Sequence, residues 1–320
     1  MISTFIRTRF LEYKFQRICR SINEKPRDID RWIDLISALK VGGHLSAQSR
    51  ALVDAHDINK GGHAVHAFSA PIMDRAGPEF DRIAKSPCSE IDTAIQQIVK
   101  WKTALQCGYS HDVSKGYFID AEPAMQLQWN QIIYPLIKDF DFSSVVDLAC
   151  GHGRNSEMLS HHADEIHLID INQSCIEACR DRFGTKKNKA KFFYYVTKGN
   201  NISMIQDASI SLVYSWDSMV HFDKLIVNDY VSDIARALKE GGMAFLHHSN
   251  FGEVAPDSDW ATNTGTRSDM SARLMQQYAQ KAGLEVVDQK IQGRAEGWGV
   301  DGLDCASILR KPLRSATALR

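Results

Sequence analysis

Several features that would assign a chain to a special class of protein are missing from this sequence. Seven cysteines are scattered over 320 residues, with no CxxC pair and no Cys/His spacing typical of metal ligands. The 38 basic residues nearly balance the 39 acidic ones, which leaves a formal charge of -1. This balance gives no general attraction to nucleic acid or anionic lipid. We therefore expect no nucleic-acid partner and a reducing, cytoplasmic environment.

Long apolar runs are also missing. The N-terminal stretch lacks the uninterrupted apolar core of a signal peptide, and no later segment reaches the length of a membrane span. We therefore expect a soluble protein without an integral span. The N-terminal stretch instead alternates basic with apolar residues at roughly helical spacing. This pattern predicts an amphipathic helix that either lies on a membrane surface or packs on the rest of the protein, and we favour packing.

Composition and length predict a globular protein with more than one part. Hydrophobic residues make up 44% and charged residues 24%. We predict a helical N-terminal region over 1–105 that carries no recognisable chemistry, and lid or linker helices over 106–141. An α/β domain is expected over 142–311, followed by a short tail over 312–320.

From about residue 142, β-branched runs alternate with amphipathic stretches, which predicts βαβ units and a parallel sheet. Strands are expected at 145–149, 165–170, 191–196, 210–216, 242–248, 285–291 and 303–309. The connection GRAEGWGVDG between the last two is Gly-rich and too short for a crossover helix. Those two strands should therefore pair antiparallel.

The stretch VVDLACGHGRNS carries the strongest chemical signal. An apolar strand delivers Asp147, and the chain then turns through Gly151 and Gly153 into a helix beginning near Arg154. Glycines let a ligand approach the backbone, and a helix N-terminus presents free N–H groups to it. The stretch therefore predicts a site for a nucleotide-like cofactor.

An acid at the end of the second strand narrows the choice of cofactor. Asp170 stands 23 residues after Asp147, where a carboxylate can accept hydrogen bonds from ribose hydroxyls. A dinucleotide fingerprint would need glycine at position 156, which holds Ser156, and the Asp147 carboxylate would repel a pyrophosphate. S-adenosylmethionine carries a sulfonium and an ammonium but no phosphate, so it suits this turn better than NAD does.

With these motifs, the region from about 117 to 311 resembles the class I S-adenosylmethionine-dependent methyltransferases. The family motif DxGxGxG is matched from Asp147 to Gly153, with Ala149 in place of the first glycine. That alanine is tolerable if its φ angle is negative. The resemblance implies a Rossmann-like, seven-stranded, mostly parallel sheet of order 3-2-1-4-5-7-6 with strand 7 antiparallel.

The resemblance also implies which residues hold the cofactor. The turn would lie beside the methionine part, the second strand's end beside ribose and adenine, and the loop after the third strand beside the adenine edge. By position these residues are Asp147, Ala149, Gly151, Gly153, Asp170, Ile171, Asn200, Asn201 and Trp216.

Methyl transfer to a hydroxyl needs alignment of the reactants and removal of a proton, so a base is expected near the ends of the fourth and fifth strands. If the chain is helical after the fourth strand, Asp217 and His221 share a face, and the aspartate orients the imidazole. His221 is our first candidate base, with helix capping or packing as its alternative role. His248, at the end of the fifth strand, is the second, since alternation turns one of His247 and His248 toward the site. We assign no metal, because no dense carboxylate cluster accompanies these residues.

Two further residues are candidates for acceptor binding. Arg267 can clamp a carboxylate, a phosphate or a sugar hydroxyl, or else pair with Asp257 or Asp259 on the surface. Tyr117 belongs to a lid-like segment before the first strand, together with Trp129, for which core packing is the competing role.

We therefore predict an S-adenosylmethionine-dependent methyltransferase that O-methylates a hydroxyl of a small molecule or sugar. The alternatives are N-methylation of a small amine, a non-catalytic binding or scaffold protein, and an NAD-dependent enzyme. The sequence does not predict the oligomeric state.

Overall fold

A computed structural model describes residues 119, 121–184, 189–197, 199–222, 224–255, 267–292 and 302–313. The predicted N-terminal helical region and Tyr117 lie outside these residues, so the predicted domain boundaries stay predictions. Among the described residues, no helix is both long and apolar enough to cross a membrane.

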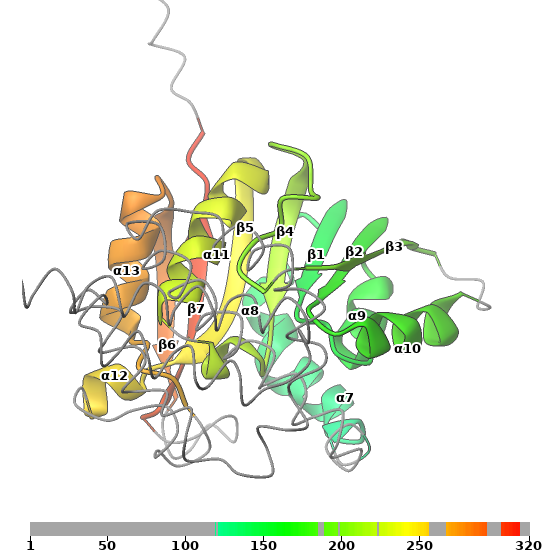
Figure 1. The fold of residues 1–320 in the computed structure, drawn as a ribbon, viewed down its shortest axis with the longest axis horizontal. Helices are drawn as coiled ribbons and strands as arrows, with labels where there is room; N and C mark the ends of the chain where they lie inside the picture. Colours follow the sequence, from blue (N-terminus) through cyan, green and yellow to red (C-terminus); the bar gives the residue numbers. More distant parts are fainter. Residues whose placement is uncertain are drawn as a thin grey trace, which may run out of the picture. The chain divides into compact units, whose positions relative to one another are not determined.

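A seven-stranded sheet forms the centre of the described part (Figure 1). Its strands are β1 (Ser144–Leu148), β2 (Glu165–Asp170), β3 (Lys191–Val196), β4 (Ile210–Ser215), β5 (Leu238–Ser249), β6 (Glu285–Ile291) and β7 (Asp304–Arg310). The order is β3-β2-β1-β4-β5-β7-β6, and β7 runs antiparallel to both of its neighbours. The predicted order and the antiparallel last strand are confirmed. Strand β5 begins earlier than predicted, because Leu238 already pairs with Ile210 before the register shifts.

Helices connect and cover these strands. They are α7 (Met125–Gln128), the π-helix η1 (Trp129–Ile133), α8 (Tyr134–Ile137), α9 (Arg154–Ser160), α10 (Gln173–Phe183), the 3-10 helix η2 (Met219–His221), α11 (Lys224–Ala237), α12 (Phe251–Val254) and α13 (Ala272–Lys281). Helix α10 packs against β2 and β3, whereas α13 packs against β6, β7 and α11. Strand β4 is buried along its whole length, as expected for the interior of a sheet covered by helices.

Trp129 takes the core role that competed with cofactor contact. It is buried, and its ring stacks on Tyr134 and His162 with centroid separations of 5.8 Å and 5.9 Å. Its cluster includes Leu159, from α9, and Phe183, from α10. The segment before β1 is therefore anchored in the hydrophobic core, in the same cluster as residues of α9 and α10.

Candidate active site

The turn between β1 and α9 adopts a left-handed backbone at three positions. The φ angles are +60° at Ala149, +54° at Gly151 and +81° at Gly153. Alanine was expected to replace the first glycine only if its φ angle were negative. The φ angle of Ala149 is positive, so this condition is not met. The N–H groups of Ala149 and Cys150 both donate to the Ile169 carbonyl on β2, at 2.8 Å and 3.1 Å, and these bonds hold the strained backbone against the neighbouring strand.

Gly153 is required for packing as well as for its φ angle. A Cβ atom built there would lie 2.7 Å from Cε2 of Phe183. Any larger residue would therefore force the buried Phe183 ring to shift, which explains why the motif ends in glycine at this position.

Asp147 is fully buried at the end of β1, and Ser156 Oγ donates a hydrogen bond of 2.5 Å to its Oδ2. The pKa of Asp147 is raised to about 7, mainly by burial. The Ser156 hydroxyl and the charge of Arg154 oppose the rise, and the nearby Asp170 adds to it. Ser156, which only excluded a dinucleotide fingerprint in the sequence, is thus the partner of the buried acid.

Asp170 lies at the end of β2 and joins the same turn. Its Oδ2 accepts from the Gly151 N–H at 3.0 Å, and its Oδ1 accepts from the Asn172 N–H at 2.9 Å. A carboxylate oxygen accepts more than one hydrogen bond, so ribose hydroxyls can still donate to this group. Ile171 follows it and is half-buried.

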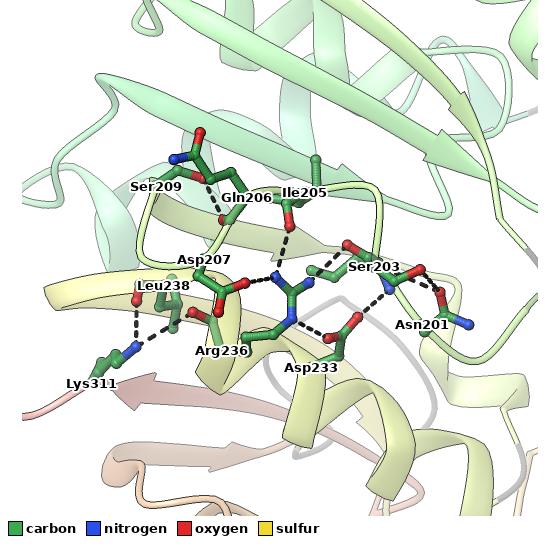
Figure 2. A network of polar contacts seen from close by, with 11 residues as sticks. Asn201, Ser203, Ile205, Gln206, Asp207, Ser209, Asp233, Arg236, Leu238 and Lys311 are labelled. Carbon is green, nitrogen blue, oxygen red and sulfur yellow. Dashed lines mark hydrogen bonds and ion pairs between the residues drawn. The ribbon is translucent and has the colours of Figure 1, made fainter.

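The loop after β3 is held by a polar network on α11 (Figure 2). Arg236 donates to the carbonyls of Ile202 and Ile205, at 3.1 Å and 2.7 Å, and Asp233 accepts from the Ile202 N–H at 2.6 Å. Asn201 Oδ1 accepts from Ser203 Oγ at 2.7 Å, and Asn200 Nδ2 lies 3.3 Å from Asp229 Oδ2. Both asparagines are thus engaged locally, and their contact with adenine stays a prediction.

The segment after β4 is tied to the glycine turn across the β1–β4 boundary, where the sheet order reverses. Ser218 Oγ donates to the Ala149 carbonyl at 3.2 Å. Arg154, at the start of α9, donates from Nη2 to Asp217 Oδ2 at 2.7 Å. Ligands of open α/β sheets bind at such a reversal, beside the carboxyl ends of the strands. These contacts place Asp217 at that edge.

Two expectations for this segment are corrected. Trp216, which the resemblance implied as a cofactor residue, is buried, with its ring stacked on Phe245 at 5.8 Å. The chain after it is not an α-helix, because Asp217 has a φ of +60° and η2 is a short 3-10 turn. Asp217 and His221 therefore do not share a helical face, and the Asp217 carboxylate pairs with Arg154 instead.

His247 and His248 point to opposite faces of β5, as alternation requires, but the one directed at the β4 segment is His247. Its Nδ1 accepts from the Asp217 N–H at 3.1 Å. The His248 ring is fully buried, with Nδ1 2.8 Å from the Ser249 carbonyl and Nε2 2.7 Å from Ser307 Oγ. Burial lowers the pKa of His248 to about 4. These contacts do not favour His248 as a base.

Arg267 forms a buried, two-pronged ion pair with Asp304. The distances are 2.6 Å from Nε to Oδ1 and 2.8 Å from Nη2 to Oδ2. Burial alone would raise the pKa of Asp304, but the contacts with His247 and Arg267 outweigh it and hold that pKa below its usual value. Arg267 was alternatively expected to form an ion pair on the surface with Asp257 or Asp259. It is buried instead, and those two aspartates lie outside the described residues.

Comparison with known proteins identifies the domain. Residues 145–242 match the family model described as a methyltransferase domain. This match runs from β1 into β5 and agrees with the resemblance to the methyltransferases that the motif indicated. A methyltransferase domain is consistent with the cofactor that the motif and the family resemblance predicted, S-adenosylmethionine. No curated protein matches the chain.

Solved structures with a similar fold include several methyltransferases. An S-adenosylmethionine-dependent methyltransferase from Clostridium acetobutylicum is 14% identical, with a TM-score of 0.48 over 61% of this chain and 99% of that chain. One from Leishmania major is 13% identical, with a TM-score of 0.48 over 67% and 82%. A Pyrococcus horikoshii protein is 19% identical, with a TM-score of 0.47 over 58% and 90%.

The turn fits the charge of this cofactor. The Asp147 carboxyl is buried and reluctant to ionise, so a cation brought beside it would stabilise the ionised form, whereas a phosphate would not. Individual residue roles at this site stay predictions.

Proposed function

We propose that this methyltransferase domain transfers the methyl group to a hydroxyl of a small molecule or sugar. The supporting observation is that Asp217 and His221 lie on one short segment, which Ser218 and Arg154 join to the cofactor turn. A hydroxyl acceptor has to lose its proton during transfer, and histidine is the side chain that most often takes a proton in enzymes. The proposal therefore keeps His221 as the base.

In this proposal, one group of residues binds the cofactor and another orients the acceptor. When bound, S-adenosylmethionine supplies a methyl group on an already activated sulfonium. Asp147 and Asp170 would bind the cofactor's charged and hydroxyl groups, and the turn would bring them close to backbone amides. Asp217, whose charge faces Arg154, would orient the acceptor rather than take its proton, because an arginine partner lowers the proton affinity of a carboxylate.

Incubation of the purified protein with methyl-labelled S-adenosylmethionine and a metabolite extract tests the proposal, with labelled products identified by mass spectrometry. We expect an O-methyl product. An N-methyl product would overturn hydroxyl transfer and support the amine alternative. Absence of both binding in calorimetry and label transfer would overturn the enzyme and support a scaffold, and an NADH titration run in parallel covers the dinucleotide alternative.

A substitution of the proposed base, His221, distinguishes a hydroxyl acceptor from an amine acceptor. His221→Asn should lower turnover on a hydroxyl by about 100-fold or more, because general-base help is typically worth that much. An amine acceptor needs little such help, so turnover would then stay nearly intact. His162→Asn, which changes a histidine in the aromatic cluster around Trp129, serves as the matched control.

A further inference from the structure

The peptide of Asp217 is held in a strained conformation by a histidine from the next strand. Its φ of +60° lies in the left-handed region, which few non-glycine residues adopt. The N–H group of this residue donates to His247 Nδ1 at 3.1 Å. Strain of this kind persists only when the surroundings fix it, and here a single ring nitrogen receives the strained peptide. The position of the Asp217 carboxylate therefore depends on the His247 ring as well as on Arg154.

The His247 ring is fixed on its other sides. The Trp216 ring lies against it, with 4.4 Å between ring centroids. Because Nδ1 accepts a hydrogen bond, the proton of the neutral ring sits on Nε2. Nε2 faces Asp304 Oδ2 at 3.6 Å, which is longer than a hydrogen bond, so the carboxylate favours this tautomer through its charge.

Asp304 is itself anchored by the sheet and by an arginine. It is the first residue of β7 and pairs in register with Ser249, at the end of β5. Its carboxylate is fully buried and takes both prongs of the Arg267 guanidinium. A forked arginine contact fixes orientation as well as charge. A rigid chain of contacts therefore runs from β7 to the strained peptide after β4.

We propose that His247 and Asp304 are positioning residues for methyl transfer, which hold the Asp217 peptide and the segment bearing His221 at the acceptor side of the cofactor turn. This inference rests on the proposed function, because it takes the acceptor to lie beside these two residues. Neither positioning residue touches the cofactor or the acceptor in this scheme. Asp304 acts through His247, and His247 acts through the Asp217 peptide.

Two substitutions at one position separate positioning from bulk stability. His247→Asn places an amide oxygen close to where Nδ1 stood, so the Asp217 N–H keeps an acceptor. His247→Gln reaches toward Asp304 but leaves no acceptor at the Nδ1 position. Both replace one buried ring by one amide, so they disturb packing to a similar degree. His167→Gln, on β2, is the control for loss of an imidazole elsewhere in the sheet.

The measurements on the full chain are kcat and KM for labelled S-adenosylmethionine with the metabolite extract, its Kd by calorimetry, and Tm. We expect His247→Gln to lower kcat by about 30- to 100-fold, the loss that a displacement of about 1 Å can cause, with KM and Kd within about threefold. His247→Asn should recover most of that loss at a similar Tm. Equal kcat in the two variants, or losses that simply follow Tm, would overturn the proposal.

A spectroscopic readout stands apart from turnover. In protein labelled with 15N at histidine, the signals that disappear in His247→Gln belong to His247, and we expect them to show a proton on Nε2 and a lone pair on Nδ1. A proton on Nδ1 would overturn the inference even if the wild type transfers methyl groups. If the wild type transfers no label, the proposed function fails and positioning for transfer fails with it, whereas the expected tautomer would still support His247 as the residue that holds the Asp217 peptide.

Discussion

At the scale of single residues, the buried acid at the end of β1 links the fold to the cofactor. The pKa of Asp147 is raised to about 7 by burial, so the carboxyl is largely protonated in slightly acidic solution. If the carboxylate lies beside the cationic part of the cofactor, binding requires loss of that proton. Cofactor affinity and solution pH should therefore be linked through this one residue.

We predict that the Kd for S-adenosylmethionine falls as the pH rises from about 5.5 to about 7, by up to tenfold per unit, since each unit shifts the carboxyl toward its ionised form. Calorimetry at several pH values measures this slope. Asp147→Asn should bind weakly with no slope over that range. A wild-type Kd that stays constant between these pH values would contradict the prediction.

Ala149 offers a second test at this scale. Its φ of +60° disfavours any residue with a Cβ, so Ala149→Gly should raise the free energy of unfolding by about 0.5–1 kcal/mol. Urea denaturation measures the gain. Ala235→Gly, inside α11, is the matched control and should lower stability by a similar amount, because glycine weakens a helix interior. A loss in both variants would mean that the turn is not strained.

At the scale of elements, the seven strands of the sheet and the direction of the last one could be predicted from the sequence. Apolar β-branched runs, helical connections of ordinary length and one short Gly-rich connection predicted seven strands and the antiparallel β7. The same patterns could not choose between His247 and His248, because both faces of an interior strand are covered. They also missed Asp304, since its partners come from β5 and from the segment before α13. Such contacts depend on tertiary packing, which no local spacing records.

The predicted alignment of Asp217 with His221 after β4 was wrong for a related reason. Asp217 and His221 would share a face only if this segment were helical, but bonds to Arg154 and His247 hold Asp217 at a positive φ. Tertiary contacts thus determine the backbone at the edge where the candidate site lies. Departures from local rules are common at functional sites.

The loop after β3 gives a prediction at the same scale. Arg236 joins two loop carbonyls and Asp233 in the network of Figure 2. Arg236→Ala should lower the free energy of unfolding by about 1–3 kcal/mol, because buried carbonyls lose their donor, and should speed amide exchange in residues 199–209. Arg310→Ala, which removes an exposed pair with Glu285, should change stability by less than about 1 kcal/mol. Unchanged exchange in the loop of Arg236→Ala would refute the anchoring role.

At the scale of the whole molecule, two buried groups oppose each other as the pH changes. Asp147 has a folded pKa of about 7 against 3.8 for the free side chain, so its contribution to stability is lost as the pH rises from about 4 to about 7. His248 has a folded pKa of about 4 against 6.5, so its contribution is present above about 6.5 and is lost as the pH falls toward about 4. Between these limits the two slopes have opposite signs, and stability should vary little.

When either group is removed, the free energy of unfolding should show the pH dependence that the other group causes. His248→Gln, whose amide can still reach Ser307, should be more stable at about pH 5 than at about pH 7, with a slope of at most about 1.4 kcal/mol per unit. Asp147→Asn should show the opposite slope over the same range, and the double variant should be nearly flat again. Urea denaturation of the four proteins at about pH 5, 6 and 7 measures these slopes. If both single variants keep the wild-type pH dependence, the two buried groups do not titrate in the folded protein as their burial requires.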